Sequence, residues 1–332
     1  MKFPRISIVT PSLNQGKYLE RTILSIINQN YPNLEYFIID GGSTDGSVDI
    51  IKKYENKINY WVSEDDTGQS HAINKGLSRA TGDIITWINS DDQLLPGALK
   101  KVVKYFELNH NIGLIHGKTI LYDNEGFSEI RGADPNNLVS RYLSGMPFPQ
   151  PSSFFRNDVI VKYGLLDQKL HFGMDYDLLC RIVLNYDILM VDDIFSNYLL
   201  HKNSKSETSH AEFAKDWMKV FSKLIRTIDA SHWILEEMKI LELYVSTDEE
   251  FTVSKKFSDD EIQKAFLFFL INQIIFNYQA LNLRKTAQLT DYLRKNYRKF
   301  YDENNLSQVY WRSKYAFFGS IIRVYRKNKK VR

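Results

Sequence analysis

The stretch Ile84-Ile85-Thr86-Trp87-Ile88-Asn89-Ser90-Asp91-Asp92 decides the fold class. Its first five residues are almost all apolar, the pattern of a strand that is buried on both faces of a sheet. Its last four are polar and mark the end of that strand. Such runs, with helices between them, predict an α/β fold with an open, mostly parallel sheet flanked by helices.

The same pattern occurs three times earlier in the chain. We expect strands over residues 6–10, 36–40 and 60–62, with helical periodicity at 18–27, 48–54 and 69–80. Right-handed crossovers bring the carboxyl ends of such strands to one edge of the sheet, where ligands bind. Polar clusters follow all four strands: Thr10-Pro11-Ser12, Asp40-Gly41-Gly42-Ser43, Glu64-Asp65-Asp66 and Asn89-Ser90-Asp91-Asp92. We therefore predict one binding crevice at this edge.

The pattern changes after residue 113. Short strands are expected at residues 113–116, 118–122 and 188–191, with a helix at 175–184. A polar loop at 201–209 then precedes helical periodicity that continues to the end of the chain. We predict an α/β domain over residues 1–208 and a helical region over residues 209–332.

Composition narrows the class of protein. The 332 residues have a formal net charge of +3, which is too small to predict a nucleic-acid partner. The one cysteine, Cys180, can form no internal disulfide and lies in a helical pattern. We expect it to be a buried, inert thiol in a protein of a reducing compartment.

Membrane-spanning and secretory patterns are also lacking in the sequence. The longest apolar stretch, residues 265–278, is interrupted by Asn272, Gln273 and Asn277 and is too short for a bilayer. Residues 1–5 lead directly into the first strand without the pattern of a signal peptide. We expect a cytoplasmic protein that is at most peripheral at the inner face of the plasma membrane.

The pair Asp91-Asp92 is the first candidate for chemistry. Two adjacent carboxylates after a buried strand can hold a hard divalent cation and the diphosphate that the cation bridges. The alternative is a turn followed by an N-cap for a helix that starts near Pro96.

The second candidate is the segment from Asp40 to Gly46. Its glycines permit positive φ angles and close approach of a ligand to the backbone. Asp40 could accept hydrogen bonds from a base or ribose, and Ser43 or Asp45 could instead cap the following helix. The segment is not GxGxxG, so it does not predict a dinucleotide site.

The third candidate is Asp175, at the start of the helix expected at 175–184. It could serve as a general base or as a helix cap. Asp177 precedes Arg181 by four residues, which predicts a structural ion pair on one helix face.

Together these segments resemble the family 2 glycosyltransferases, which have the A-type nucleotide-sugar fold. The resemblance extends from about residue 5 to residue 205 and leaves the C-terminal third uncovered. It rests on blocks in the family's order: Ser7 to Asn14, Ile39 to Gly46, Ser63 to Gln69, Ala72 to Gly76, Gly82-Asp83, Asn89 to Asp92 with Pro96 to Leu99, Pro149 to Ser152, Asp175 to Leu178, and His201 to Ser206.

The resemblance implies a role for most of these residues. Asp40 would hydrogen-bond the base, and Asp175 would be the catalytic base. Asp91, Asp92 and the later His201 would hold a divalent metal, Mn²⁺ or Mg²⁺, although His201 could also be an exposed loop histidine. Gln150 and Met174 would lie on the acceptor side. The other donor-binding residues would be Thr10, Pro11, Ser12, Asn14, Gly42, Ser43, Glu64, Asp66, Gln69 and Asn74.

The chain departs from the family pattern at three positions. Asn89 replaces the first acid of the usual Asp-x-Asp, which lowers the charge available to a metal. Gly41 replaces the second acid of the usual Asp-Asp-Gly-Ser. Met174 replaces the acid that often precedes the base, a neighbour that could tune its pKa.

The resemblance implies an inverting, metal-assisted transferase of hexosyltransferase type. It would move a sugar from a nucleotide-sugar donor to a hydroxyl of a glycan or lipid-linked acceptor, as in the assembly of bacterial cell-envelope polysaccharides. A carboxylate at residue 40 suits the N3–H of uracil, so we expect a UDP-sugar, with dTDP still open. The rival hypotheses are a nucleotidyltransferase and a non-catalytic sugar-binding relative.

The C-terminal residues suggest a membrane contact. Apolar residues from Tyr315 onward are followed by six basic side chains: Arg323, Arg326, Lys327, Lys329, Lys330 and Arg332. Such an anchor could dock on an anionic membrane at about 1 kcal/mol per basic residue. The alternative is a helix packed on the protein with a solvated basic end.

Overall fold

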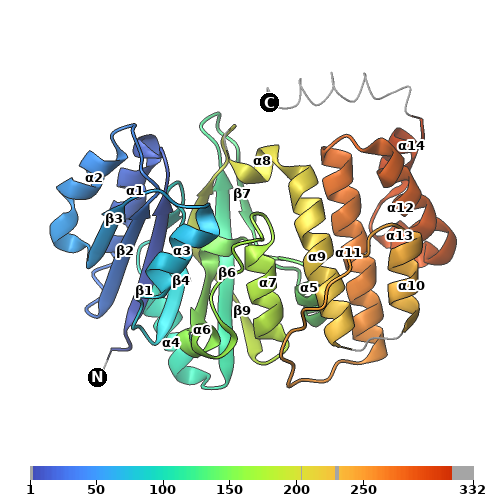
Figure 1. The fold of residues 1–332 in the computed structure, drawn as a ribbon, viewed down its shortest axis with the longest axis horizontal. Coiled ribbons are helices and arrows are strands. Elements are labelled where there is room, and N and C mark those ends of the chain that lie inside the picture. The colour runs from blue at the N-terminus through green and yellow to red at the C-terminus, as the bar shows by residue number, and fades with distance from the viewer. Residues whose placement is uncertain (1–2, 203, 229–231, 316–332) are drawn as a thin grey trace. The chain divides into compact units, whose positions relative to one another are not determined.

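The computed structural model describes residues 3–202, 204–228 and 232–315 (Figure 1). The strands are β1 (Ile6–Ser12), β2 (Leu34–Asp40), β3 (Tyr60–Ser63), β4 (Ile84–Trp87), β5 (Gln93–Leu94), β6 (Ile112–Tyr122), β7 (Ser128–Arg131), β8 (Ser153–Arg156) and β9 (Asp187–Leu199). The helices of the first 200 residues are α1 (Gly16–Ile27), α2 (Ser47–Lys53), α3 (Gln69–Leu77), α4 (Ala98–Leu108), α5 (Leu138–Ser144), α6 (Asn157–Tyr163) and α7 (Met174–Val183), with 3₁₀ turns at Glu55–Lys57 and Gln150–Ser152.

The strands form one sheet in the order β3-β2-β1-β4-β8-β6-β9-β5, and β7 pairs with β6. The first four are parallel, with Val9 of β1 opposite Phe37 of β2 and Trp87 of β4. β8 is antiparallel to β4 and β6, whereas β9 is parallel to β6. The predicted α/β sheet is confirmed, and its parallel pairing is concentrated in the first half of the chain.

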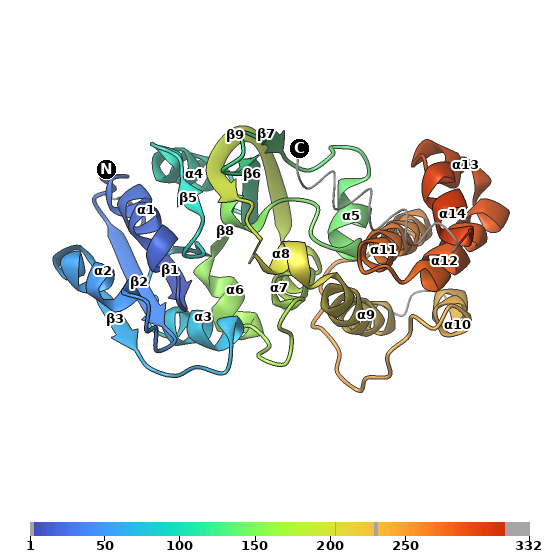
Figure 2. The same cartoon turned by 90° about the horizontal axis from the view of Figure 1, so that it is seen from above.

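Helices cover both faces of the parallel strands (Figure 2). On one face, Ile6 and Ile8 of β1 pack in one core with Leu19 and Ile23 of α1. On the other face α3 approaches so closely that a Cβ at Gly76 would lie 2.5 Å from Cγ1 of Val9. This double coverage explains why the strands are almost wholly apolar.

The second half of the sheet differs from the prediction in strand length. The two short strands expected at 113–116 and 118–122 are one strand, β6, which has a register shift near Gly117. β9 extends to Leu199, well past the predicted end at residue 191. Its charged residues face solvent or lysines: Asp192 is largely exposed and lies 2.9 Å from Lys118, and Asp193 lies 2.6 Å from Lys101.

The described chain divides into two compact units. Among the described residues, the first contains 3–138, 146–200 and 252–255, and the second contains 139–145, 201–202, 204–228, 232–251 and 256–315. The boundary predicted after residue 208 stays a prediction. A short helix, α8 (Lys205–Thr208), forms within the segment that was expected to be a polar loop.

The second unit is helical, as predicted. Besides α5 and α8, its described helices are α9 (His210–Thr227), α10 (His232–Ile240), α11 (Asp259–Gln279), α12 (Leu283–Asn296), α13 (Arg298–Glu303) and α14 (Ser307–Lys314). Phe221 of α9 stacks on Phe269 of α11 at 4.0 Å between ring centroids. The amides that interrupt the apolar stretch are used inside the unit, because Gln273 donates to the carbonyl of Ala214 and Asn272 to that of Ser144, both at 3.1 Å.

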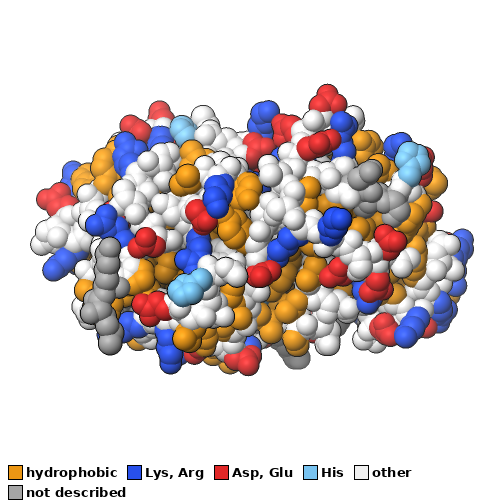
Figure 3. Space-filling view, turned by 90° about the horizontal axis from the view of Figure 1, so that it is seen from below, with side chains coloured by type: hydrophobic (Ala, Val, Ile, Leu, Met, Phe, Trp, Pro, Cys, Tyr) orange, Lys and Arg blue, Asp and Glu red, His pale blue; other side chains and the backbone are white. Residues whose placement is uncertain are grey.

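Three features can be compared with the composition: the surface charge, the apolarity of the helices and the burial of Cys180. Figure 3 shows basic and acidic side chains interspersed over the face that it draws. In the part of the chain that the structure describes, none of the helices combines the length and apolarity that crossing a bilayer requires. Cys180 is buried, as predicted.

Candidate active site

The loops after β1 and β2 are tied to each other. The Asn14 N–H donates to Oγ of Ser43 at 2.7 Å, and Oδ1 of Asn14 accepts from the Thr44 N–H at 2.9 Å. The Gly16 N–H donates to Oδ2 of Asp45 at 2.9 Å. Asn14 and Ser43, both expected to bind the donor, therefore lie together at the carboxyl edge of the sheet.

Asp40 has a structural role at this edge. Its Oδ2 accepts from the N–H groups of Gly42 and Ser43 at 3.2 and 2.8 Å and from the Ser63 hydroxyl at 2.7 Å. Its Oδ1 accepts from the Ser43 hydroxyl at 2.5 Å. Asp40 is 0% exposed. The carboxylate of Asp40 thus serves its own loop, and its expected contact with a base stays a prediction.

Residues 10–12 are also buried. The Tyr36 hydroxyl donates to Oγ1 of Thr10 at 3.2 Å inside the core. Thr10 is 0% exposed, and its expected place in the lining of a base and ribose pocket stays a prediction. Pro11 and Ser12 are buried, and Oγ of Ser12 has no hydrogen-bond partner among the described residues.

The segment after β3 leads into α3. Glu64 pairs with Lys75 at 2.8 Å on the surface, and Oδ1 of Asp66 accepts from the Gly68 N–H at 2.7 Å. Gln69, the first residue of α3, donates from Nε2 to Oδ1 of Asn89 at 2.8 Å. The ends of β3 and β4 are thus joined through a side chain of α3.

The turn from Asn89 to Asp92 is held by α1. Oγ1 of Thr22 donates to the carbonyl oxygens of Ser90 and Asp92 at 2.9 and 2.7 Å. Nδ2 of Asn89 donates to Oδ2 of Asp92 at 3.1 Å. Asp92 is buried and 1% exposed, whereas Asp91 is partly exposed. Of the two acids, Asp91 is the one that a ligand can reach directly.

The burial of Asp92 has an electrostatic consequence. Desolvation raises the pKa of Asp92 well above the ordinary value of a carboxyl group, and the nearby charge of Asp91 raises it further. The hydrogen bond from Asn89 opposes both effects. A buried carboxyl group of this kind favours a positive charge beside it.

This turn fits a metal that is shared with a substrate. Within residues 3–202, 204–228 and 232–315, no three His, Cys, Asp or Glu side chains gather as a metal site. Mg²⁺ is commonly held by one or two carboxylates together with substrate phosphates, and Asp91 with Asp92 behind it matches that pattern. His201 belongs to the second unit, and its expected approach to a metal stays a prediction.

Asp175 is the second residue of α7. Its Oδ1 accepts from the Tyr176 N–H at 2.8 Å, and Gly173 rather than Asp175 occupies the N-cap position. The helix starts one residue earlier than predicted. The predicted ion pair between Asp177 and Arg181 is confirmed, and both side chains are buried.

The segment before Asp175 is docked on α3. The Ser70 hydroxyl contacts the sulfur of Met174 at 2.8 Å and the Leu170 carbonyl at 3.2 Å. Asn74 donates to the Leu166 carbonyl at 2.8 Å and accepts from the Leu166 N–H at 3.0 Å. Met174 and Asn74 are buried. The expected roles of Met174 on the acceptor side and of Asn74 along the nucleotide stay predictions. Both residues position the α7 segment.

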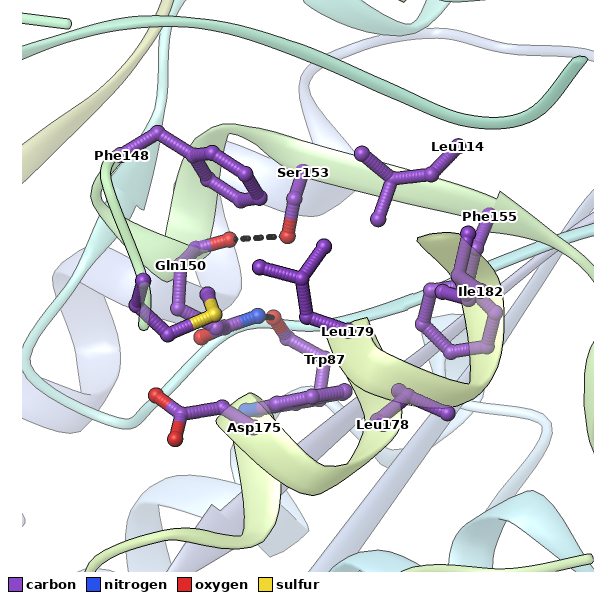
Figure 4. Close-up of a pocket in the computed structure, with 11 residues that line it drawn as sticks. Trp87, Leu114, Phe148, Gln150, Ser153, Phe155, Asp175, Leu178, Leu179 and Ile182 are labelled. Carbon is purple, nitrogen blue, oxygen red and sulfur yellow. Dashed lines mark hydrogen bonds between the residues drawn. The ribbon is translucent and has the colours of Figure 1, made fainter. Parts of the chain in front are cut away.

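A small, mostly apolar pocket lies beside Asp175 (Figure 4). Gln150 is fixed at this pocket because its Nε2 donates to the Trp87 carbonyl at 2.9 Å. Oε1 of Gln150 is buried without a hydrogen-bond partner among the described residues. The pocket is lined by Trp87, Leu114, Met146, Phe148, Gln150, Ser153, Phe155, Asp175, Leu178, Leu179 and Ile182.

Comparison with known proteins identifies the family. The family model described as glycosyl transferase family 2 matches residues 7–160. The glycosyltransferase MT1564 of Mycobacterium tuberculosis is 30% identical over 185 residues, which cover 54% of this chain and 70% of that protein. The chain belongs to glycosyltransferase family 2.

Other relatives of this transferase match over shorter parts. A glycosyltransferase of Haemophilus influenzae is 37% identical over 129 residues, which cover 38% of this chain and 51% of that protein. The GalNAc(5)-diNAcBac-PP-undecaprenol beta-1,3-glucosyltransferase of Campylobacter jejuni is 29% identical over 165 residues, 48% of each chain. The chain thus spans about half the length of these two relatives.

Two solved structures share the fold of the transferase. Staphylococcus aureus TarS in complex with UDP-GlcNAc has a TM-score of 0.55 at 16% identity, and the match covers 93% of this chain and 91% of that one. The mannosyltransferase PcManGT of Pyrobaculum calidifontis, in complex with GDP-Man and Mn²⁺, has a TM-score of 0.59 at 16% identity, covering 95% and 87%. Identities this low support the fold only.

Sequence reasoning missed several residues of the transferase site. Thr22 and Ser70 hold the two acidic segments in place, yet each lies in an ordinary helical pattern. Met146 and Phe148 line the pocket beside Asp175 from an irregular segment without periodicity. The blocks Pro149 to Ser152 and Asp175 to Leu178 are the sequence signals close to that pocket.

Proposed function

We propose that this transferase moves a sugar from a UDP-sugar to a hydroxyl of a glycan or lipid-linked saccharide, with inversion at the anomeric carbon. One observation carries the proposal: α3 connects both acidic segments. Gln69 at its start contacts Asn89 in the turn of Asp91 and Asp92, and Ser70 contacts Met174 beside Asp175. One helix therefore positions an acid for the diphosphate and an acid for the acceptor.

The chemistry requires these two groups. Asp175 takes the proton of the acceptor hydroxyl, which is a poor nucleophile until it is deprotonated. Asp91, backed by Asp92, would hold a divalent cation, Mn²⁺ or Mg²⁺, whose charge offsets that of the leaving diphosphate. A single base on the acceptor side suits single displacement and inversion, and no covalent nucleophile is needed. Membership of the family favours glycosyl transfer over nucleotidyl transfer or a purely binding role.

Gln150 belongs to the acceptor side in this proposal. Its buried Oε1 has no hydrogen-bond donor among the described residues. It lines the same pocket as Asp175, and for this reason we place Gln150 on the acceptor side. The C. jejuni relative, named for a lipid-linked acceptor, supports that class of acceptor.

The replacement Asp175→Asn tests the base. We expect UDP binding to stay unchanged, because the residue does not contact the nucleotide, and UDP release from a panel of UDP-sugars with saccharide acceptors to fall by about 10²-fold or more. Asp167→Asn is the matched control, since Asp167 lies before the same helix and does not line the pocket. Transfer at the wild-type rate by Asp175→Asn would refute the assignment.

Nucleotide binding tests the donor. Calorimetry with UDP, dTDP and GDP should show the tightest binding for UDP in the presence of Mn²⁺. The TarS complex with UDP-GlcNAc supports this choice, whereas PcManGT shows that the same fold also accepts GDP-Man. Tighter binding of GDP than of UDP would contradict the proposal.

The basic C-terminal residues are part of the proposal as a peripheral membrane contact. They lie outside the described residues, so the hypothesis rests on their sequence alone. We expect the full chain to sediment with anionic liposomes at low salt and to be released at high salt, and a chain ending at Gly319 to stay in solution. A full chain that ignores anionic liposomes would leave the packed-helix alternative.

A further inference from the structure

The backbone at Gly41 is covered by a carboxylate from another loop. A Cβ built at Gly41 would lie 2.5 Å from Oδ2 of Asp66 and 3.2 Å from its Cγ. The Asp66 side chain thus occupies the space into which a side chain at position 41 would point. The sequence has glycine at position 41, where the family pattern has its second acid, and a carboxylate reaches the same place from the loop after β3.

The surroundings of Asp66 leave one of its carboxylate oxygens available to a ligand. Its Oδ1 accepts from the Gly68 N–H at 2.7 Å, which fixes the orientation of the carboxylate. Gly68 has φ +127°, a conformation that other residues rarely adopt. Oδ2 accepts no hydrogen bond from any described residue, and Asp66 is partly exposed. Asp40, only one residue before Gly41, is fully buried and hydrogen-bonded at both oxygens.

An apolar surface lies next to this carboxylate. Leu13 is 52% exposed, and its Cδ1 would lie 3.4 Å from a Cβ at Gly41. Leu13 follows β1, and the chain places β2 on one side of β1 and β4 on the other. Ligands bind at such a switch point, beyond the carboxyl ends of the strands.

We propose that Asp66, not Asp40, recognises the base of the donor, and that Gly41 is glycine because the Asp66 carboxylate needs its space. This inference rests on the proposed nucleotide-sugar donor. A flat ring lies against Leu13 and donates one N–H to Oδ2 of Asp66. The single presented acceptor matches the N3–H of uracil and repels the N3 lone pair of cytosine. Guanine presents two adjacent N–H donors, but the second carboxylate oxygen, Oδ1, already accepts from the Gly68 N–H.

The test combines a variant with a modified nucleotide. Binding of UDP and of N3-methyl-UDP is measured by calorimetry with wild-type protein and with Asp66→Asn. We expect Asp66→Asn to weaken UDP binding by about tenfold or more, the range for a hydrogen bond to a charged group. N3-methylation should weaken binding to the wild type by a similar factor and should cause little further loss in Asp66→Asn.

A swap variant tests the shared space. Gly41→Asp alone should lose UDP binding, because two carboxylates then compete for one place. Adding Asp66→Gly should restore binding, since the acid then reaches the base from position 41. Asp65→Asn is the matched control and should bind UDP within about twofold of wild type, because Asp65 lies against Gly42 instead. Thermal unfolding of each variant checks that it is folded.

The outcomes separate this inference from the proposed function. UDP binding by Asp66→Asn at wild-type strength, or an equal effect of N3-methylation in both proteins, overturns the role of Asp66 and leaves the proposed donor standing. Wild-type protein that binds no nucleoside diphosphate overturns the proposed function itself. If Gly41→Asp does not fold, the comparison of UDP with N3-methyl-UDP still decides.

Discussion

Asp40 and Asp92 are both buried carboxylates at the carboxyl ends of neighbouring parts of one sheet, yet their surroundings differ sharply. Asp40 accepts four hydrogen bonds from Gly42, Ser43 and Ser63. The one side-chain donor to Asp92 within the described residues is Asn89, at 3.1 Å. Asp40 is satisfied by its own loop, whereas Asp92 is left with most of its charge uncompensated.

This difference in hydrogen bonding indicates that Asp40 stabilises the fold, whereas Asp92 supports ligand binding. Hydrogen bonds from backbone N–H groups compensate the burial of Asp40 and fix the shape of its loop. Burial of Asp92 without such donors raises its pKa and disfavours its charge until a cation arrives. Residue type alone does not distinguish these two roles, but the number of hydrogen-bond donors does.

Removing the structural acid should have the largest effect. Asp40→Ala leaves the N–H groups of Gly42 and Ser43 and the Ser63 hydroxyl without their acceptor. An unsatisfied buried donor costs about 1–3 kcal/mol. Because these three hydrogen bonds are only partly buried, we expect the free energy of unfolding to fall by about 3–6 kcal/mol, the lower part of the summed range. Urea unfolding of the wild type and of Asp40→Ala measures this loss of free energy.

Asp45→Ala is the control for Asp40→Ala. Asp45 also accepts from backbone N–H groups, those of Gly16 and Ser47, but it is exposed. Water can replace these bonds, so a loss of about 1 kcal/mol is expected. Equal losses for the two variants would show that the burial of Asp40 is unimportant.

Neutralising the other acid should have the opposite effect on stability. Asp92→Asn keeps the shape and removes a buried charge, so we expect the metal-free protein to gain about 1–2 kcal/mol at pH 8. The same change should weaken Mn²⁺-dependent UDP binding about 10–100-fold, the usual cost of losing a group that supports a metal site. Unfolding and calorimetry on the same samples test both parts, and a variant that is both less stable and unchanged in binding contradicts them.

The pH dependence of stability provides a second test of the raised pKa of Asp92. The pKa of Asp92 is higher in the folded protein than the value of about 3.9 in the unfolded chain. Between these two values the folded state binds more protons, so its stability is highest at low pH and falls as pH rises. Relative to Asp92→Asn, the wild type should lose up to about 1.4 kcal/mol per pH unit between about pH 4 and the folded-state pKa of Asp92, and nothing further above that pKa. A relative gain with rising pH would show that the pKa is lowered instead.

The sequence predicted the sheet better than it predicted the site. Continuous apolar runs identified β1 to β4 within two residues because burial on both faces leaves a local signal. It placed Asp40, Asn74 and Met174 in contact with substrates, whereas the structure buries them. Their burial depends on partners far along the chain, such as Ser63 for Asp40 and Leu166 for Asn74, and no periodicity encodes such pairs.

The smallest effect on stability is expected where Asn89 meets Asp92. Asn89→Asp keeps an acceptor for Gln69 but replaces the donor to Asp92 with a negative charge. Without metal we expect a loss of about 1 kcal/mol, since one hydrogen bond is removed beside an acid that is already destabilised.

In the presence of UDP we expect Asn89→Asp to bind Mn²⁺ more tightly than the wild type. The added carboxylate increases the negative charge around a divalent cation. Asn89→Ala removes the same donor without adding charge, so it should lose similar stability and gain no affinity for Mn²⁺. Calorimetric titration of Mn²⁺ into each UDP-saturated variant separates the two. If Asn89→Asp binds Mn²⁺ no better than Asn89→Ala, the turn from Asn89 to Asp92 does not hold the metal and has a structural role only. Asp92 would then be a structural acid like Asp40, although it accepts fewer hydrogen bonds.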